Sequence, residues 1–149
     1  MAFTYTASST GSTLQTETVS IEVSPASGVI AATMLPGDSV SGTINVSNTG
    51  TVDEYYFITA DWKAADDDTT PSLAALLAYN LNVSVAVGGT DLFAGKLEDL
   101  IDRPDSPGRE LTLTTANEDV SFNFTLPTDA GNAVQDIDLA IDFVFVATS

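Results

Sequence analysis

The chain has 149 residues, of which 44% are hydrophobic, a composition that suits one folded domain with a sizeable core. Four Lys and Arg against 21 Asp and Glu give a formal net charge of −17, which would repel a phosphate backbone and argues against nucleic acid as a partner. No apolar run has the roughly 18 residues of a membrane-spanning helix. The first residues lack the features of a signal peptide, so a secreted protein would be present here in its mature form.

The N-terminal residues combine a short alternation with a polar stretch. Phe3 and Tyr5 alternate with small residues, and residues 8–13 are small and polar. The pattern predicts a strand over residues 2–7 followed by a flexible tether. A frayed terminus is the alternative interpretation.

Alternating apolar and polar residues predict four strands in the first half of the chain. They cover residues 14–23, 28–34, 40–47 and 52–63. Turns separate them, with Pro36 and Gly37 suited to a type II turn.

The middle of the chain predicts two short helices on either side of a strand. Thr70 and Pro71 suit the N-cap and first position of the first helix. After a strand over residues 81–87, Asp91 could cap a second helix, weakened by Gly95, in which four apolar residues share a face. Those residues are Phe93, Leu97, Leu100 and Ile101.

The last third contains two alternating runs, Val120–Leu126 and Ile137–Phe145, joined by residues typical of turns. We expect them to form a hairpin-like pair. The whole pattern predicts an all-β, jelly-roll-type sandwich over residues 14–149. The predicted core includes Val19, Ile21, Ile44, Val46, Ile58, Val83, Val85, Phe122, Phe124, Leu139, Ile141 and Phe143.

Several of these segments resemble motifs of one protein family and follow one another in the same order. They are Leu-Pro-Gly-Asp-Ser (35–39) before an alternating strand, Asn-Thr-Gly (48–50) before an aromatic strand, Gly-Gly (88–89), Leu-Glu-Asp-Leu (97–100), and Leu-Pro-Thr-Asp-Ala-Gly-Asn (126–132) before the last strand. Together they resemble the TasA and camelysin family of secreted bacterial and archaeal surface proteins, several of which build extracellular fibres.

The resemblance implies an extracellular filament or biofilm-matrix subunit. Residues 1–13 would act as a donor strand and tether, inserting into the next copy and polymerising the protein head-to-tail. The predicted donor residues are Ala2, Phe3, Thr4, Tyr5, Thr6 and Ala7. The alternative is a monomeric surface adhesin or glycan-binding sandwich, for which Tyr55, Trp62 and Tyr79 are the candidate aromatic residues.

Some camelysin-type members carry a metallopeptidase label, but this sequence argues against catalysis. With no His, it cannot supply the two imidazoles of a His-Glu-x-x-His zinc site, and with no Cys it lacks a thiol nucleophile. The many carboxylates leave a hydrolase with two catalytic carboxylates as the alternative. We expect no enzymatic activity.

No cofactor is indicated with certainty, but clustered carboxylates suit a hard cation. Asp66, Asp67 and Asp68, with Asp61 nearby, could offer oxygen atoms to Ca²⁺. A second group is Asp99, Asp102 and Asp105. The alternative is a solvated acidic surface.

Three Asn-x-Ser/Thr triplets begin at Asn45, Asn82 and Asn123. The strand pattern places all three on polar faces, which permits glycosylation. Strands rich in Asn, Ser and Thr also produce such triplets by chance.

Overall fold

The computed structural model describes residues 3–10, 19–24, 27–31, 36–64, 70–130 and 139–149. Its strands are β1 (Phe3–Thr10), β2 (Ile21–Ser24), β3 (Ser27–Ala31), β4 (Ser39–Asn48), β5 (Glu54–Ala64), β6 (Asn82–Val87), β7 (Thr90–Lys96), β8 (Arg109–Leu111), β9 (Asn117–Thr125) and β10 (Leu139–Thr148). They are joined by one α-helix, α1 (Pro71–Asn80), and two 3₁₀ turns, Leu97–Asp99 and Thr128–Ala130.

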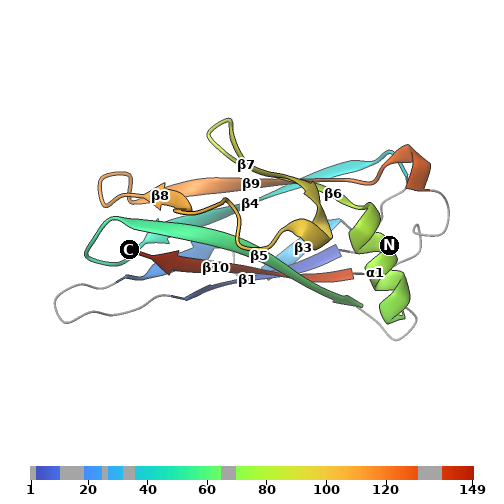
Figure 1. Cartoon of the computed structure of the whole chain (residues 1–149), viewed down its shortest axis with the longest axis horizontal. Coiled ribbons are helices and arrows are strands. Elements are labelled where there is room, and N and C mark those ends of the chain that lie inside the picture. The colour runs from blue at the N-terminus through green and yellow to red at the C-terminus, as the bar shows by residue number, and fades with distance from the viewer. Residues whose placement is uncertain (1–2, 11–18, 25–26, 32–35, 65–69, 131–138) are drawn as a thin grey trace.

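The strands form two five-stranded sheets that face each other (Figure 1). The first sheet has the order β3-β1-β10-β5-β8, and the second has the order β2-β4-β9-β6-β7. Among the described strands, β1 and β10 form the one parallel pair and the other pairs are antiparallel. The all-β sandwich is confirmed, and its jelly-roll character stays a prediction.

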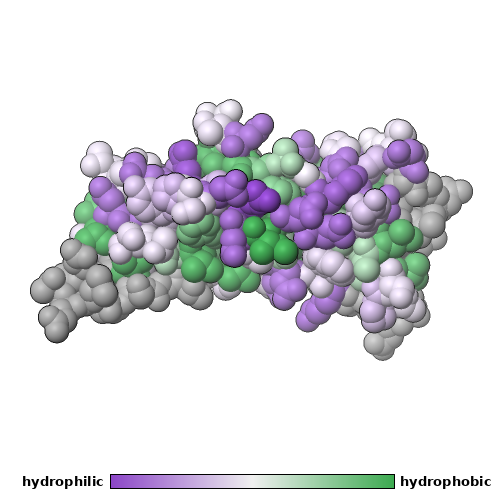
Figure 2. Space-filling view, viewed as in Figure 1, coloured by the Kyte–Doolittle hydropathy of each residue, from purple (hydrophilic) through white to green (hydrophobic). Residues whose placement is uncertain are grey.

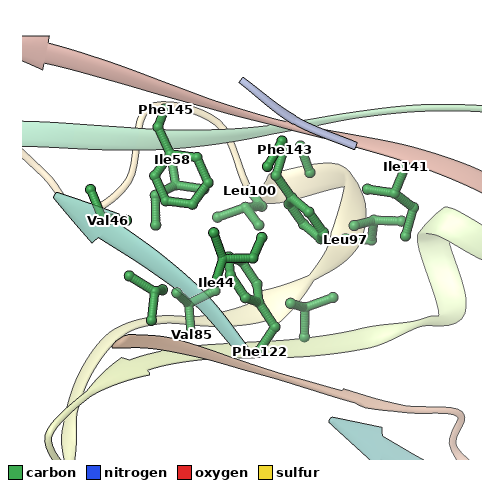
Figure 3. Close-up of a cluster of buried hydrophobic side chains, with 14 of the residues drawn as sticks. Ile44, Val46, Ile58, Val85, Leu97, Leu100, Phe122, Ile141, Phe143 and Phe145 are labelled. Atoms are coloured by element: carbon green, nitrogen blue, oxygen red, sulfur yellow. The ribbon is translucent and has the colours of Figure 1, made fainter. Parts of the chain in front are cut away.

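The core lies between the sheets, as alternation within the strands requires. In Figure 3, Phe143, Phe145 and Ile58 of the first sheet face Phe122 and Ile44 of the second. Every predicted core residue is buried except Leu139, whose side chain lies outside the described part of the structure. The predicted inward faces are therefore confirmed wherever the structure describes them.

The predicted pairing of the last two runs is wrong. β9 lies between β4 and β6 in the second sheet, whereas β10 lies between β1 and β5 in the first. The two strands meet through their side chains, and the ring centres of Phe122 and Phe143 are 4.5 Å apart. Alternation gives each strand an inward face but does not say which sheet it joins.

One of the two predicted helices is confirmed. In α1 the Thr70 hydroxyl accepts a hydrogen bond from the backbone N–H of Leu73 at 3.2 Å, and Pro71 occupies the first turn. The helix lies at one end of the sandwich (Figure 1) and buries Ala74, Leu77 and Ala78.

The second predicted helix is instead strand β7. Gly88 and Gly89 adopt φ values of +56° and +85°, which close a two-residue turn and direct the chain back along β6. Only residues 97–99 make a helical turn, a 3₁₀ turn in which Leu97 is buried. The two glycines favour a hairpin more strongly than the apolar spacing after them favours a helix.

An ion pair joins the two sheets near the edge strand β8. Arg109 of β8 donates two hydrogen bonds to the Glu118 carboxylate of β9, from Nε at 3.0 Å and from a terminal nitrogen at 2.9 Å. The hydroxyl of buried Tyr56 donates to the same carboxylate at 2.7 Å. Burial, with this hydrogen bond second, raises the pKa of Tyr56 well above its usual range. The carboxylate of Glu118 therefore accepts three hydrogen bonds from two side chains of the opposite sheet.

One face of the molecule is largely polar. On the side shown in Figure 2, hydrophilic side chains predominate, and hydrophobic ones stand among them in separate small groups. Within the described residues no helix is long and apolar enough to cross a membrane.

Candidate functional site

The first strand occupies an interior position in the first sheet. All eight residues of β1 pair in parallel with Leu139–Val146 of β10, and its other side pairs with β3. A parallel pair cannot be closed by a tight turn. Among the described residues, β1 is held in the sheet by its two backbone ladders.

The faces of β1 match those of its neighbour. Ala7 is buried and pairs in register with Phe143, a core residue, while Thr4, Thr6 and Ser8 are exposed. On the exposed face the Thr6 hydroxyl donates a hydrogen bond to the Asp142 carboxylate. The strand thus adds to the core of the sandwich as well as to its sheet.

The predicted donor segment lies largely within β1, but the predicted tether begins too early. Residues 8–10 continue the strand, because β10 extends far enough to supply partners for them. The backbone of Phe3 and Tyr5 pairs with Leu139 and Ile141. Ala2 and residues 11–13 lie outside the described residues.

After residues 11–18 the chain is fixed at Ser20. Its backbone N–H donates to Glu54 Oε1 at 2.6 Å, its carbonyl accepts from the backbone N–H of Thr49 at 2.9 Å, and its hydroxyl accepts from the Thr49 hydroxyl at 2.9 Å. The preceding Val19 is buried. Val19 and Ser20 therefore belong to the packed body of the sandwich.

Glu54, at the start of β5, is a buried carboxylate that the sequence analysis missed. Its side chain is inaccessible to solvent, and among the described residues Oε2 has no hydrogen-bond partner. Burial, only partly opposed by the Ser20 hydrogen bond, raises the pKa of Glu54 above its usual value of 4.5. Nothing in the sequence distinguishes this Glu from its exposed acidic neighbours.

We expect Glu54→Gln to stabilise the protein relative to wild type at neutral pH, and this gain to shrink as the pH falls. The folded state of the wild type binds the Glu54 proton more tightly than the unfolded chain does. The stability of the wild type therefore falls as the pH rises from about 4.5, the usual pKa, through the raised pKa that Glu54 has in the folded state. Gln keeps an oxygen for the Ser20 N–H and removes the charge.

Thermal unfolding of both proteins between pH 4 and pH 8, in high salt to screen the other carboxylates, measures this difference. Glu22→Gln, on an exposed side chain of β2, is the control. A difference between Glu54→Gln and wild type that does not change with pH would contradict the prediction.

The predicted calcium ligands are not brought together where the structure describes them. Asp66, Asp67 and Asp68 lie outside the described residues, and no group of three or more acidic side chains among the described ones could hold a metal ion. Asp99, Asp102 and Asp105 therefore form no cluster. The Asp105 carboxylate instead pairs with Arg103 at 2.8 Å.

The three candidate aromatic residues form no single platform. Trp62 is half-buried and packs against the core. Tyr55, seven residues earlier in β5, lies on the other face of that strand, where its hydroxyl donates to Glu110 at 3.2 Å. Tyr79 is exposed on α1.

An open hollow of about 550 Å³ lies beside the edge strand β7. Phe93 and Ile101 line it, together with Arg103, whose guanidinium carbon is 5.9 Å from the centre of the Phe93 ring. The Arg103 guanidinium is already paired with Asp105. None of these side chains therefore offers an unpaired positive charge to a ligand.

The three glycosylation triplets lie in β4, β6 and β9, which are neighbours in the second sheet. Asn123 is exposed, and Asn45 and Asn82 are half-buried. Each asparagine alternates with buried residues of its strand, so all three lie on the outward face, and their glycosylation stays a prediction.

No protein-family model matches the chain. No curated protein matches it either. Among solved structures, the chain is similar to the N-terminal domain of PorA, with 6% sequence identity over 95% of this chain and 86% of that one and a TM-score of 0.33. This similarity is too low to support an argument about fold or function.

Proposed function

We propose that the protein is a subunit of an extracellular structural filament, such as a pilus-like or biofilm-matrix fibre, and that copies assemble head-to-tail by exchanging β1. The observation that carries the proposal is the place of this strand. β1 is the first strand in the chain, yet it lies between β3 and β10 inside a sheet. In the structure it completes its own sandwich, which we interpret as the unassembled form.

If β1 left its own sheet, the β1 of a second copy could take its place. Its removal would leave the facing edges of β3 and β10 without backbone partners and would uncover the core beside Phe143. The β1 of a second copy has the same sequence and can form the same ladders. Because one copy gives a strand and receives another, the contact is heterologous and can propagate as an open filament.

The firm attachment at Ser20 supports the same proposal. Glu54 and Thr49 hold the chain at that point, so the body of the domain need not rearrange when β1 leaves its place in the sheet. Exchange of β1 would leave these contacts of Ser20 unchanged. The resemblance to fibre-forming members of the TasA and camelysin family favours the same assembly.

A pair of cysteines tests the exchange directly, because the natural chain has none. Thr6→Cys and Asp142→Cys face each other across β1 and β10 on the exposed side of the sheet. Oxidised as a dilute monomer, this variant should hold β1 in its own chain and form no filaments. Oxidised after assembly under reducing conditions, it should give a ladder of covalent multimers on a non-reducing gel.

Thr43→Cys with Ser121→Cys is the matched control. This pair also joins exposed positions on neighbouring strands, β4 and β9, but it remains within one copy in either state. Electron microscopy of a chain without residues 2–13 is a second test of strand exchange. Filaments from the truncated chain, or from the monomer locked at residues 6 and 142, would refute strand exchange.

We further expect assembly to depend on ions. Each added copy brings a net charge of −17, and the repulsion between copies must be screened by salt or offset by bound cations. Sedimentation of assembled protein should therefore increase with NaCl or Ca²⁺. Equal assembly at low salt in EDTA would contradict this prediction, and a response to Ca²⁺ at constant ionic strength would indicate specific ligands such as Asp66, Asp67 and Asp68.

The alternative is a monomeric adhesin or glycan-binding module, which would use the hollow beside β7 rather than the dispersed aromatic residues. Monomers from both the full and the truncated chain, together with saccharide binding that is lost in Phe93→Ala, would favour it.

A further inference from the structure

The outer face of the second sheet is rich in small hydroxyl and amide side chains. On its three central strands the outward residues are Ser39, Ser41, Thr43, Asn45, Ser47, Asn82, Ser84, Ala86, Asn117, Asp119, Ser121, Asn123 and Thr125. Asp119 is the one charged residue of this set, in a chain with 21 acidic residues. All three glycosylation triplets lie on this face.

Asn123 is the most accessible of the three asparagines. It lies on β9, the central strand of the sheet, and pairs in register with Ser41 of β4 and Ser84 of β6. Both neighbours are small, so they leave room above the Asn123 amide. In the described part of the chain this amide makes no hydrogen bond, and its side chain is exposed. The hydroxyl of Thr125, two residues on, lies on the same face.

The other two asparagines have less freedom. The amide nitrogen of Asn45 donates to Asp119 at 2.9 Å and to Asn117 at 3.2 Å, so a sugar on that nitrogen would disrupt both hydrogen bonds. Asn82 is half-buried and pairs with Lys96, a longer residue than the serines beside Asn123. The folded structure therefore ranks Asn123 first and Asn45 last.

We propose that Asn123 is an N-glycosylation site and that the outer face of the second sheet carries the glycan. The co-reactant would be a lipid-phosphate-linked oligosaccharide, and the catalyst an oligosaccharyltransferase. The Asn123 amide nitrogen forms a bond to the anomeric carbon while the bond from that carbon to the phosphate oxygen breaks. The lipid phosphate leaves with the bonding electrons, and one amide proton passes to a base of the transferase.

A glycan at this position would leave the fold intact. No hydrogen bond within the described residues is lost. The side chains on the opposite face of β9, Phe122 and Phe124, still pack into the core. The glycan would keep the second sheet from packing face to face against another protein. The first sheet, which contains β1, would remain uncovered, so this inference does not depend on the proposed strand exchange.

The test is secretion of the full chain from a eukaryotic host that modifies Asn-x-Ser/Thr triplets, followed by intact mass and glycopeptide mapping. We expect added sugar mass, with its main site at Asn123. Asn123→Gln and Thr125→Val should each lose this mass, whereas Thr125→Ser and Asn45→Gln should keep it. Thr125→Val keeps the Asn123 acceptor. A loss of sugar in this variant would therefore show that the transferase recognises the whole triplet.

Circular dichroism of each secreted variant checks that it has folded, and only folded variants are compared. Absence of sugar on the folded wild type would overturn the proposal. So would occupancy at Asn45 equal to or greater than that at Asn123, because the hydrogen bonds of Asn45 would then have no influence on the modification.

Discussion

Replacing Phe122 by alanine should lower the free energy of unfolding by about 3–5 kcal/mol, the usual cost of deleting a large buried aromatic side chain. Phe122 is 1% exposed and lies at the centre of a group of aromatic rings. Its ring centre is 4.5 Å from that of Phe143, 6.4 Å from that of Phe145 and 6.5 Å from that of Phe124. The substitution would leave a cavity between strands of opposite sheets, which cannot close without moving one sheet toward the other.

Urea denaturation followed by circular dichroism measures this effect. Ser121→Ala is the matched control, because it changes the neighbouring residue on the exposed face of the same strand, where we expect a change within about 0.5 kcal/mol. Similar losses in the two variants would show that the core is not centred on Phe122.

The second large effect is expected at the ion pair between the sheets. Glu118→Ala should cost about 3 kcal/mol, because it leaves both the Arg109 guanidinium and the buried Tyr56 hydroxyl without an acceptor. The side chain of Glu118 is only 9% exposed and that of Arg109 is 31% exposed, so water can replace the lost contacts only in part. Urea denaturation in low and high salt measures the loss.

Two further variants isolate the cause. Glu110→Ala removes the neighbouring carboxylate, which accepts a hydrogen bond from Tyr55 at an exposed position, and it should cost at most about 1 kcal/mol. A triple variant, Arg109→Met with Tyr56→Phe and Glu118→Leu, removes the unpaired groups together and should recover much of the stability. If the triple variant is less stable than Glu118→Ala, the unpaired donors are not the source of the loss.

The sequence predicts local geometry well and the pairing of distant segments poorly. The alternation in β9 places Phe122 and Phe124 inward and Asn123 outward, as the structure confirms. The same alternation cannot tell whether β9 and β10 are neighbours in one sheet or face each other across the core. In the structure they face each other, because each lies between other strands of its own sheet.

The wrong helix shows how two local signals can compete. Phe93 and Leu97 have helical spacing, but the turn at Gly88 and Gly89 begins a hairpin, and β7 gains a backbone ladder with β6. Both signals are local in sequence, and the turn decides between them. The candidate site shows how poorly distant pairing is predicted: the sequence predicts a strand over residues 2–7, but neither its continuation to Thr10 nor its parallel pairing with β10. The burial of Glu54 depends equally on contacts made far along the chain.

The parallel alignment of β1 and β10 has a mechanical consequence. If β1 is shared between copies, tension along a filament pulls this strand lengthwise past β10. A lengthwise load is borne by all eight residue pairs of the ladder together, whereas a sideways load would break them one after another. The antiparallel ladder with β3 adds resistance on the other side of the strand. Filaments joined in this way should resist stretching more strongly than they resist peeling at an end.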